Sequence, residues 1–336
     1  MLDNIKNILM IRRGAYGDII FTLPCYHLLK ANFPNSKITY LAKNNYAEIL
    51  KGFPGLDDII TIKKKEYHTA NPIKLWEIAT DLFHTVKAGN FQLAIDFVGH
   101  GEQAFLLWAC GIENRWGSIK TNKPIRQFFY TEYFTRNQPE VHLTDQHLSL
   151  LAKGGLTHYP INNQYVIPEE NLEKARYLFQ EWGLSFDTPA IYIQPFTGDG
   201  VPGKMWPIER YAAVADYWRK QGVQVLFGGG PAERELLNSV AGQFPIAAGR
   251  ADFVTSIALA SLCSFILGGD TGLLHAATAV GKRVVMLVGP TNPLRAGPYR
   301  HPEWAVKPPS GTLIEDVSIE KVIEATQTAF DEIGKR

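Results

Sequence analysis

The stretch FILGGDTGLLHAATAV, residues 265–280, decides the fold, because glycines join a short apolar run to a helical pattern in it. The run 265–267 predicts a buried strand, and residues 273–280 predict a helix with one apolar face. A buried strand followed by a glycine-rich loop and a helix is the unit from which parallel α/β sheets are built. The sequence therefore predicts an α/β protein.

The same order of apolar run, loop and amphipathic segment recurs along the whole chain. We expect further strands at residues 8–11, 38–41, 59–62, 93–97, 190–194, 223–227 and 284–288. We expect further helices at residues 18–32, 143–153, 169–182, 207–221, from 232 onward, and 318–333. Turn residues and weak periodicity between residues 156 and 168 place a domain boundary near residue 165.

The prediction is therefore two doubly wound, Rossmann-like domains in tandem, residues 1–165 and 166–317. A C-terminal helix, residues 318–336, follows them, and we expect it to pack toward the N-terminal domain. Ligands of such sheets bind outside the carboxyl ends of the strands. Two domains facing a cleft would bring two substrates together there.

Composition excludes several classes of protein. The 336 residues are 46% hydrophobic and 20% charged, which is typical of a globular chain. A formal net charge of +1 argues against a nucleic-acid binder that relies on bulk charge. Residues 1–165 hold 18 Lys and Arg against 14 Asp and Glu, whereas the remainder holds 16 against 19. An acidic partner would therefore favour the first half.

The chain has the character of a cytoplasmic protein. Its three cysteines form no C-x-x-C pair and lie among apolar residues, as buried thiols do in a reducing compartment. The apolar run 8–11 ends at Arg12 and Arg13, so no signal peptide is expected. No run approaches the roughly 20 apolar residues of a membrane span. The basic run 63–65 is compatible with peripheral contact with an anionic membrane surface.

The first loop, RRGAYGD at residues 12–18, follows the first strand. Asp18 opens a helix there, either as a carboxylate favoured by the helix dipole or as a general base for a bound hydroxyl. The loop lacks the full G-x-G-x-x-G, and no acid ends the second strand, so NAD is disfavoured. Lys43 leaves NADP as a remaining alternative.

The loop at residues 268–275, GGDTGLLH, has the features of a phosphate site. The free N–H groups at a helix start bind phosphate oxygens, and Thr271 and His275 share one face near that start. Taken singly, Asp270 reads as a helix cap and His275 as a structural histidine. The glycines that follow a strand make the phosphate site the better interpretation.

Two further loops of the second half carry candidate residues. Lys204 precedes a helix and is either solvated or placed to neutralise a departing diphosphate. Glu233, in GGGPAE at residues 228–233, is either a first-turn acid or a ligand of a ribose diol. The chain has no Asp-x-Asp pair, Walker A motif or G-x-S-x-G elbow, and the first absence removes the simplest carboxylate site for a metal-bound nucleotide.

The sequence resembles the bacterial heptosyltransferases, glycosyltransferase family 9, which build the inner core of lipopolysaccharide. The resemblance covers nearly the whole chain. It rests on ILMIRRGAYGDIIFTL (8–23), GKMWP (203–207), GGPAE (229–233) and DTGLLHAATAVGKRVVMLVGPTNPLRAGP (270–298). It implies a GT-B fold with a nucleotide-sugar donor in the C-terminal domain, an acceptor in the N-terminal domain, and neither a metal nor a cofactor.

The resemblance also implies roles for single residues. Asp18 matches the catalytic base, and Lys204 matches the phosphate-binding lysine that assists the leaving group. The donor side is implied to comprise Thr197, Gly230, Glu233, Asp270, Thr271, Gly272 and His275. The acceptor side is implied to comprise Arg12, Gly17 and His100.

The usual donor of similar enzymes is ADP-L-glycero-β-D-manno-heptose, and the usual acceptor is Kdo-lipid A or an already heptosylated core. Where many relatives carry an Arg after the fourth strand, this chain has GHGEQ at residues 99–103, which leaves the acceptor open. We expect an inverting transfer by single displacement on the cytoplasmic face of the inner membrane. A nucleotide-sugar epimerase and a non-catalytic sugar-nucleotide binding protein are the alternatives.

Overall fold

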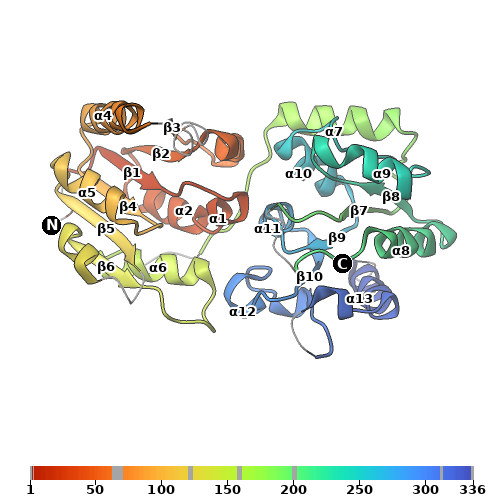
Figure 1. The fold of residues 1–336 in the computed structure, drawn as a ribbon. Coiled ribbons are helices and arrows are strands. Elements are labelled where there is room, and N and C mark those ends of the chain that lie inside the picture. Colours follow the sequence, from red (N-terminus) through yellow and green to blue (C-terminus); the bar gives the residue numbers. More distant parts are fainter. Residues whose placement is uncertain are drawn as a thin grey trace. The chain divides into compact units, whose positions relative to one another are not determined.

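The computed structural model describes residues 2, 4–62, 71–119, 124–156, 161–198, 203–310 and 313–333. The chain divides into two compact units, Met1–Gln164 and Tyr165–Arg336, and each has its own parallel sheet (Figure 1). The basic run 63–65 and much of the loop 198–203 lie outside the described residues. Within the described part of the chain, no helix has the length and apolarity that crossing a membrane requires.

The first unit has a six-stranded parallel sheet in the order β3-β2-β1-β4-β5-β6. Its strands are β1 (Asn7–Ile11), β2 (Lys37–Lys43), β3 (Asp58–Ile62), β4 (Leu93–Asp96), β5 (Asn114–Ile119) and β6 (Glu132–Thr135). Its helices are α1 (Tyr16–Ile20), α2 (Leu23–Asn32), α4 (Pro72–Ala88), α5 (Gly101–Ala109) and α6 (Leu143–Lys153), with 3-10 helices η1 (Asn44–Gly52) and η2 (Pro124–Phe129). This is the Rossmann strand order, and its direction reverses between β1 and β4.

The second unit has a five-stranded sheet in the order β11-β10-β9-β7-β8. Its strands are β7 (Ala190–Gln194), β8 (Gln224–Phe227), β9 (Phe265–Gly269), β10 (Arg283–Leu287) and β11 (Ala305–Val306). Its helices are α7 (Glu169–Glu181), α8 (Ile208–Lys220), α9 (Arg234–Ala241), α10 (Phe253–Leu262), α11 (Gly272–Ala279), α12 (Pro293–Ala296) and α13 (Ile319–Ile333), with 3-10 helices η3 (Pro231–Glu233), η4 (Pro302–Trp304) and η5 (Ile314–Asp316). The order reverses between β7 and β9.

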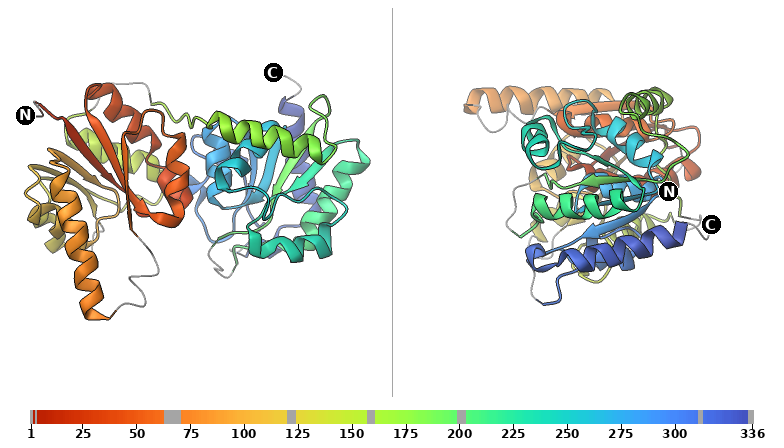
Figure 2. Two further views of the ribbon diagram at one scale, coloured as in Figure 1. Left: turned by 90° about the horizontal axis from the view of Figure 1, so that it is seen from above. Right: turned by 90° about the vertical axis from the view of Figure 1, so that its right-hand side faces the viewer.

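The closing helix, α13, is part of the second unit. It contacts α8, β9 and β10, and its residues Val322 and Ala329 are fully buried in that unit's core. Trp218 of α8 donates from its indole Nε1 to Thr326 Oγ1 at 3.0 Å. This helix therefore packs on the sheet of the second unit (Figure 2), and its packing toward the N-terminal domain stays a prediction.

The predicted helix at residues 18–32 is two helices. It breaks at Phe21 and Thr22, between α1 and α2. The buried Thr22 hydroxyl lies 2.7 Å from Ile19 O and 2.8 Å from Tyr40 Oη. The break therefore depends partly on a residue of a neighbouring strand, which a local pattern does not reveal.

Candidate functional site

The strand order of the first unit indicates where a ligand would bind. The carboxyl ends of β1 and β4 meet at the point where the order reverses, which is the usual ligand site of such sheets. Strand β1 leads into Arg12 and Asp18, and β4 leads into the loop that contains His100. Strand pairing sets Ile11 beside Asp96, so these two loops leave the sheet at neighbouring positions.

Asp18 and Arg12 form an ion pair at this point. Arg12 Nη2 lies 2.6 Å from Asp18 Oδ2, and the same oxygen accepts a hydrogen bond from the Ala15 N–H at 3.1 Å. Arg12 also donates to the Phe97 carbonyl after β4, at 2.9 Å. The Asp18 side chain keeps 31% of its surface exposed, whereas Arg12 keeps 11%. The guanidinium thus fixes the carboxylate to both loops while leaving it accessible.

The position of Asp18 accounts for both interpretations of it. Asp18 lies in the first turn of α1, and its bond to the Ala15 N–H supports the start of that helix. Gly17, in the same turn, is buried. The accessible carboxylate is also the group that can accept a proton from a bound hydroxyl.

His100 belongs to a second polar cluster, with Arg13 and Glu102. Arg13 Nη2 lies 2.7 Å from His100 Nδ1 and 3.1 Å from Glu102 Oε1. Burial and the Arg13 charge lower the pKa of His100 below its usual value. Arginine can only donate, so Nδ1 of the neutral imidazole accepts and Nε2 carries the proton. The cluster thus gives the N-terminus of α5 an imidazole N–H donor, suited to an anionic or hydroxylated ligand.

Asp96, which the sequence analysis did not single out, holds the loop that carries His100. It is fully buried at the end of β4, and burial raises the pKa of its carboxyl group. Its oxygens accept from the N–H groups of Val98 and Gly99, at 2.8 and 3.1 Å, and from Tyr130 Oη at 2.6 Å. A buried carboxylate with three donors rigidifies the backbone it binds. The sequence signal that could have identified Asp96 is its place at the end of a predicted strand.

In the second unit, Asp270 is the centre of the corresponding cluster after β9. His275 Nε2 donates to its Oδ1 at 3.1 Å, and Thr291 Oγ1 donates to its Oδ2 at 2.6 Å. Lys204 Nζ lies 3.4 Å from Oδ2. The predicted residues Asp270, Lys204 and His275 therefore lie together, where strands β7 and β9 end. Thr271, not Asp270, is the N-cap of α11, so the helix-cap interpretation of Asp270 is wrong.

The charge of Asp270 is strongly stabilised. Burial alone would raise the pKa of Asp270, but His275, Thr291 and Lys204 together lower it to about 2. A depressed carboxyl pKa adds stability that is present above the unfolded-state pKa and is lost as the pH falls through the folded-state value.

Asp270→Asn should therefore lower the free energy of unfolding of the second unit by about 2 kcal/mol at pH 7. The difference in free energy of unfolding between wild type and variant should shrink from about pH 4 down toward pH 2. Urea unfolding of both proteins across this range measures it. A gap that is the same at pH 7 and pH 3 would contradict the pKa argument.

Thr291 is a residue of this cluster that the sequence analysis missed, although it lies within the block 270–298. Its hydroxyl group contacts Asp270, so we expect it to act as a positioning residue. Thr291→Val removes the donated bond at nearly constant volume. We expect about a tenfold loss in kcat/KM for the donor, the scale of one charge-assisted hydrogen bond. Thr291→Ser should restore the rate, and equal activity of the Val and Ser variants would exclude this role.

Two hydroxyl groups beside the cluster have no hydrogen-bond partner among the described residues. They are Thr197 Oγ1, after β7, and Thr271 Oγ1, at the start of α11. Thr197 lies against Gly269, because a Cβ there would meet its Cγ2 at 2.7 Å. Buried polar groups are nearly always satisfied, so this pair of hydroxyl groups is available to a polar ligand. The N–H groups that begin α11 at Gly272 suit an anion.

Glu233 lies in the loop after β8 and closes that loop on itself. Its Oε2 accepts a hydrogen bond from the Gly230 N–H, at the start of η3. This contact supports the first-turn interpretation of Glu233. The β8 loop leaves the same edge of the sheet as Thr197, since β7 pairs directly with β8. The assignments of Glu233 to the nucleotide ribose and of Gly230 to the donor site stay predictions.

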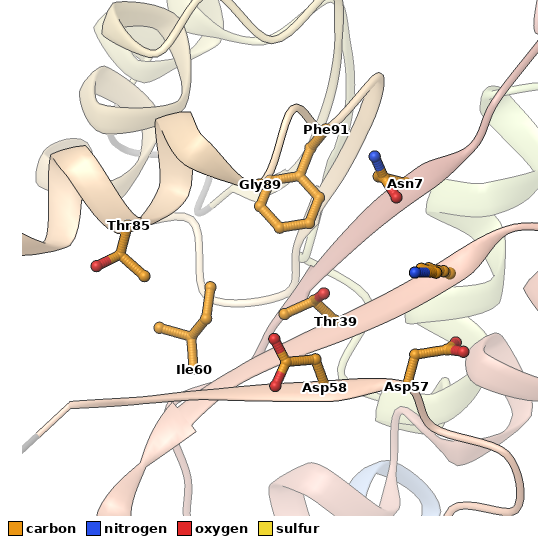
Figure 3. A pocket seen from close by; sticks show the side chains of 9 residues that line it. Asn7, Thr39, Asp57, Asp58, Ile60, Thr85, Gly89 and Phe91 are labelled. Carbon is orange, nitrogen blue, oxygen red and sulfur yellow. The ribbon is translucent and has the colours of Figure 1, made fainter.

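The described residues contain two cavities of about 500 Å³ in the first unit, and neither includes a predicted site residue. The first lies at the amino ends of β1, β2 and β3, where Asn7, Lys37 and Asp58 line it (Figure 3). That is the edge of the sheet opposite Arg12. Across the described residues, no three His, Cys, Asp or Glu side chains are grouped to hold a metal ion.

Comparison with known proteins gives consistent matches. Lipopolysaccharide core heptosyltransferase OpsX of Haemophilus influenzae is 21% identical, over 95% of each chain. The crystal structure of the glycosyl transferase family 9 from Veillonella parvula has a TM-score of 0.84 at 24% identity, over 99% of each chain. Escherichia coli heptosyltransferase WaaC, solved with ADP, has a TM-score of 0.77 at 18% identity, over 96% of this chain and 99% of that one.

These structures confirm the predicted pair of Rossmann-like, GT-B-type domains. A UDP-GlcNAc 2-epimerase from Methanocaldococcus jannaschii shares the fold less closely, with a TM-score of 0.56 at 12% identity, so the epimerase alternative is not favoured. The sequence model of glycosyltransferase family 9 (heptosyltransferase) matches residues 79–315, more than half of the chain. The chain belongs to glycosyltransferase family 9, the heptosyltransferases.

Proposed function

We propose that this protein transfers a heptose from ADP-heptose to a hydroxyl group of the lipopolysaccharide inner core, on the cytoplasmic face of the inner membrane. The observation that carries the proposal is the cluster of Lys204 and Asp270 beside the hydroxyls of Thr197 and Thr271, which have no hydrogen-bond partner in the described part of the chain. A cation, free hydroxyls and a helix start suit a sugar diphosphate. Similarity to lipopolysaccharide core heptosyltransferase OpsX and to heptosyltransferase WaaC, solved with ADP, supports both substrates.

The proposed reaction is a single displacement that inverts the anomeric centre. Asp18 takes the proton from the acceptor hydroxyl while that oxygen attacks the anomeric carbon. A new C–O bond forms to the acceptor, and the bond between the sugar and ADP breaks. ADP leaves with the electron pair of that bond, so its diphosphate gains negative charge in the transition state.

Lys204 and the start of α11 stabilise this growing charge. An interaction that strengthens as charge develops lowers the barrier rather than only tightening binding. Asp270 holds His275 and Thr291 in place and, in this proposal, orients the donor sugar. Arg12 and His100 contact the acceptor, whose acidic groups suit the excess of basic residues in the first half. No metal is required in this scheme, since Lys204 and helix N–H groups supply the positive potential.

The direct test incubates the pure protein with ADP-heptose and a panel of truncated core acceptors, with EDTA present, and follows acceptor mass. A gain of one heptose supports the proposal, and NMR of the new linkage reports inversion. Conversion of the donor without any acceptor would identify an epimerase. Binding of ADP-heptose without product from any acceptor would identify a sugar-nucleotide binding protein. Turnover that EDTA abolishes would contradict the metal-independent scheme.

A further inference from the structure

An exposed cluster of rings lies beside the proposed acceptor loop. This aromatic patch consists of Phe105 and Trp108 of α5 and Phe128 and Phe129 of η2. Phe105, Trp108 and Phe128 expose 52%, 48% and 78% of their surface. Ring centroids lie 5.8 Å apart for Phe105 and Trp108, and 5.8 Å apart for Phe128 and Phe129. Contiguous exposed rings are uncommon on a soluble protein and mark an interaction surface.

The aromatic patch is rigidly connected to the acceptor half of the site. Phe105 follows Gly101, the first residue of α5, by about one helical turn. Arg126 of η2 donates to the Gly99 carbonyl at 2.7 Å, in the loop that carries His100. Phe129 packs on the unit's core and contacts both Phe105 and Trp108. Whatever binds the aromatic patch therefore lies next to the acceptor loop.

The same side of the sheet carries a second exposed apolar feature, on α4. Helices α4 and α5 both contribute to the core that covers this face of the sheet. The N-terminal part of α4, orange in Figure 2, extends beyond the sheet in both views. Ile73 and Trp76 on this part are 71% and 74% exposed. Because they are three residues apart, they lie on one helix face.

We propose that the aromatic patch docks the protein on the headgroup region of a lipid bilayer, with α4 extending the contact. This rests on the proposed function, in which the acceptor is anchored in a membrane by its lipid. Tryptophan and phenylalanine rings favour this boundary, and basic side chains favour anionic headgroups. Arg115 borders the patch and donates to the Phe129 carbonyl at 2.7 Å. The first half of the chain also has the basic excess described above.

Vesicle sedimentation tests this surface without reference to catalysis. Wild-type protein should sediment with vesicles of phosphatidylglycerol and phosphatidylcholine, and less with phosphatidylcholine alone. Phe105→Ser combined with Phe128→Ser should lower the partition coefficient at least about tenfold. Tyr177→Ser is the matched control, because this ring of α7 is 65% exposed in the second unit. Both altered rings of the patch are at least half exposed, so thermal unfolding should change little.

Activity separates this inference from the proposed function. With a deacylated, water-soluble acceptor the double variant should turn over as the wild type does. With the acceptor embedded in vesicles, the turnover rate of the double variant should fall in proportion to the loss in its vesicle partition coefficient. Wild-type protein that ignores vesicles, or a double variant that binds them normally, overturns the inference whether or not transfer occurs. If the wild-type protein forms a dimer and does not bind vesicles, and the double variant is a monomer, the patch would instead be assigned to contact with a second copy of the chain.

Discussion

Asp18→Asn should reduce kcat by about 10²–10⁴-fold, which corresponds to about 3–5 kcal/mol of barrier, while the protein still folds and binds ADP. Asparagine is nearly isosteric and can still accept the Ala15 N–H bond that Asp18 accepts at 3.1 Å. It cannot take up the proton of an attacking hydroxyl. The expected loss is therefore in the chemical step. It is measured as the rate at which a soluble acceptor gains the mass of one heptose from ADP-heptose in a single turnover. Asp18→Ala should lose a similar factor.

The matched control is Asp57→Asn, in the same unit. Asp57 pairs with Lys30 at 2.9 Å and its side chain is 35% exposed, close to the 31% of Asp18. It lies at the amino ends of the strands, beside the cavity of Figure 3. Asp57→Asn should therefore lose one aspartate ion pair, here with a lysine, without losing turnover. Turnover of Asp18→Asn within tenfold of the wild type would remove Asp18 from the base role.

The fold was predictable wherever a local pattern carries the whole signal. The strand at residues 190–194 and the helix at residues 143–153 have the predicted bounds. Strand β5, with the sequence NRWGSI, was missed because arginine and glycine interrupt its apolar run. Gly117 is there because the Tyr130 ring lies 2.4 Å from where a Cβ would be. The need for a glycine here comes from a residue distant in the sequence, so the local pattern of apolar residues does not reveal it.

The candidate site, like the fold, was predictable only where a local pattern carries the signal. Asp270 and His275 are five residues apart at a strand end, and their association was readable from the loop that contains both. Thr291 follows a different strand, and only the pairing of β9 with β10 brings the two loops to one edge. Asp96 was missed because a single acid at a strand end is an ordinary feature. Its importance depends on Tyr130 and two backbone N–H groups that converge on it.

Lys204 provides the second large expected effect. Its backbone is anchored close by, because Trp206 is buried and donates from its indole Nε1 to the Val317 carbonyl at 2.8 Å. Its ammonium is held less firmly, since the 3.4 Å separation from Asp270 exceeds the 2.7–2.9 Å typical of a charge-assisted hydrogen bond. A cation on a fixed backbone with a loose head group can turn toward an incoming diphosphate.

Lys204→Ala should therefore lower kcat for heptosyl transfer by about 10²–10³-fold, the scale of losing one donor aimed at developing charge. Lys174→Ala is the control, because it breaks a lysine–aspartate pair of 3.3 Å in the same unit, with Asp252, and should leave kcat unchanged. Combining Lys204→Ala with Asp270→Asn separates two roles. If Lys204 acts on the leaving diphosphate, its removal should cost a similar factor in the Asp270→Asn background. If Lys204 serves only to hold Asp270, adding Lys204→Ala to the Asp270→Asn variant should not lower kcat further. The assignment of Lys204 to the leaving group would then be wrong.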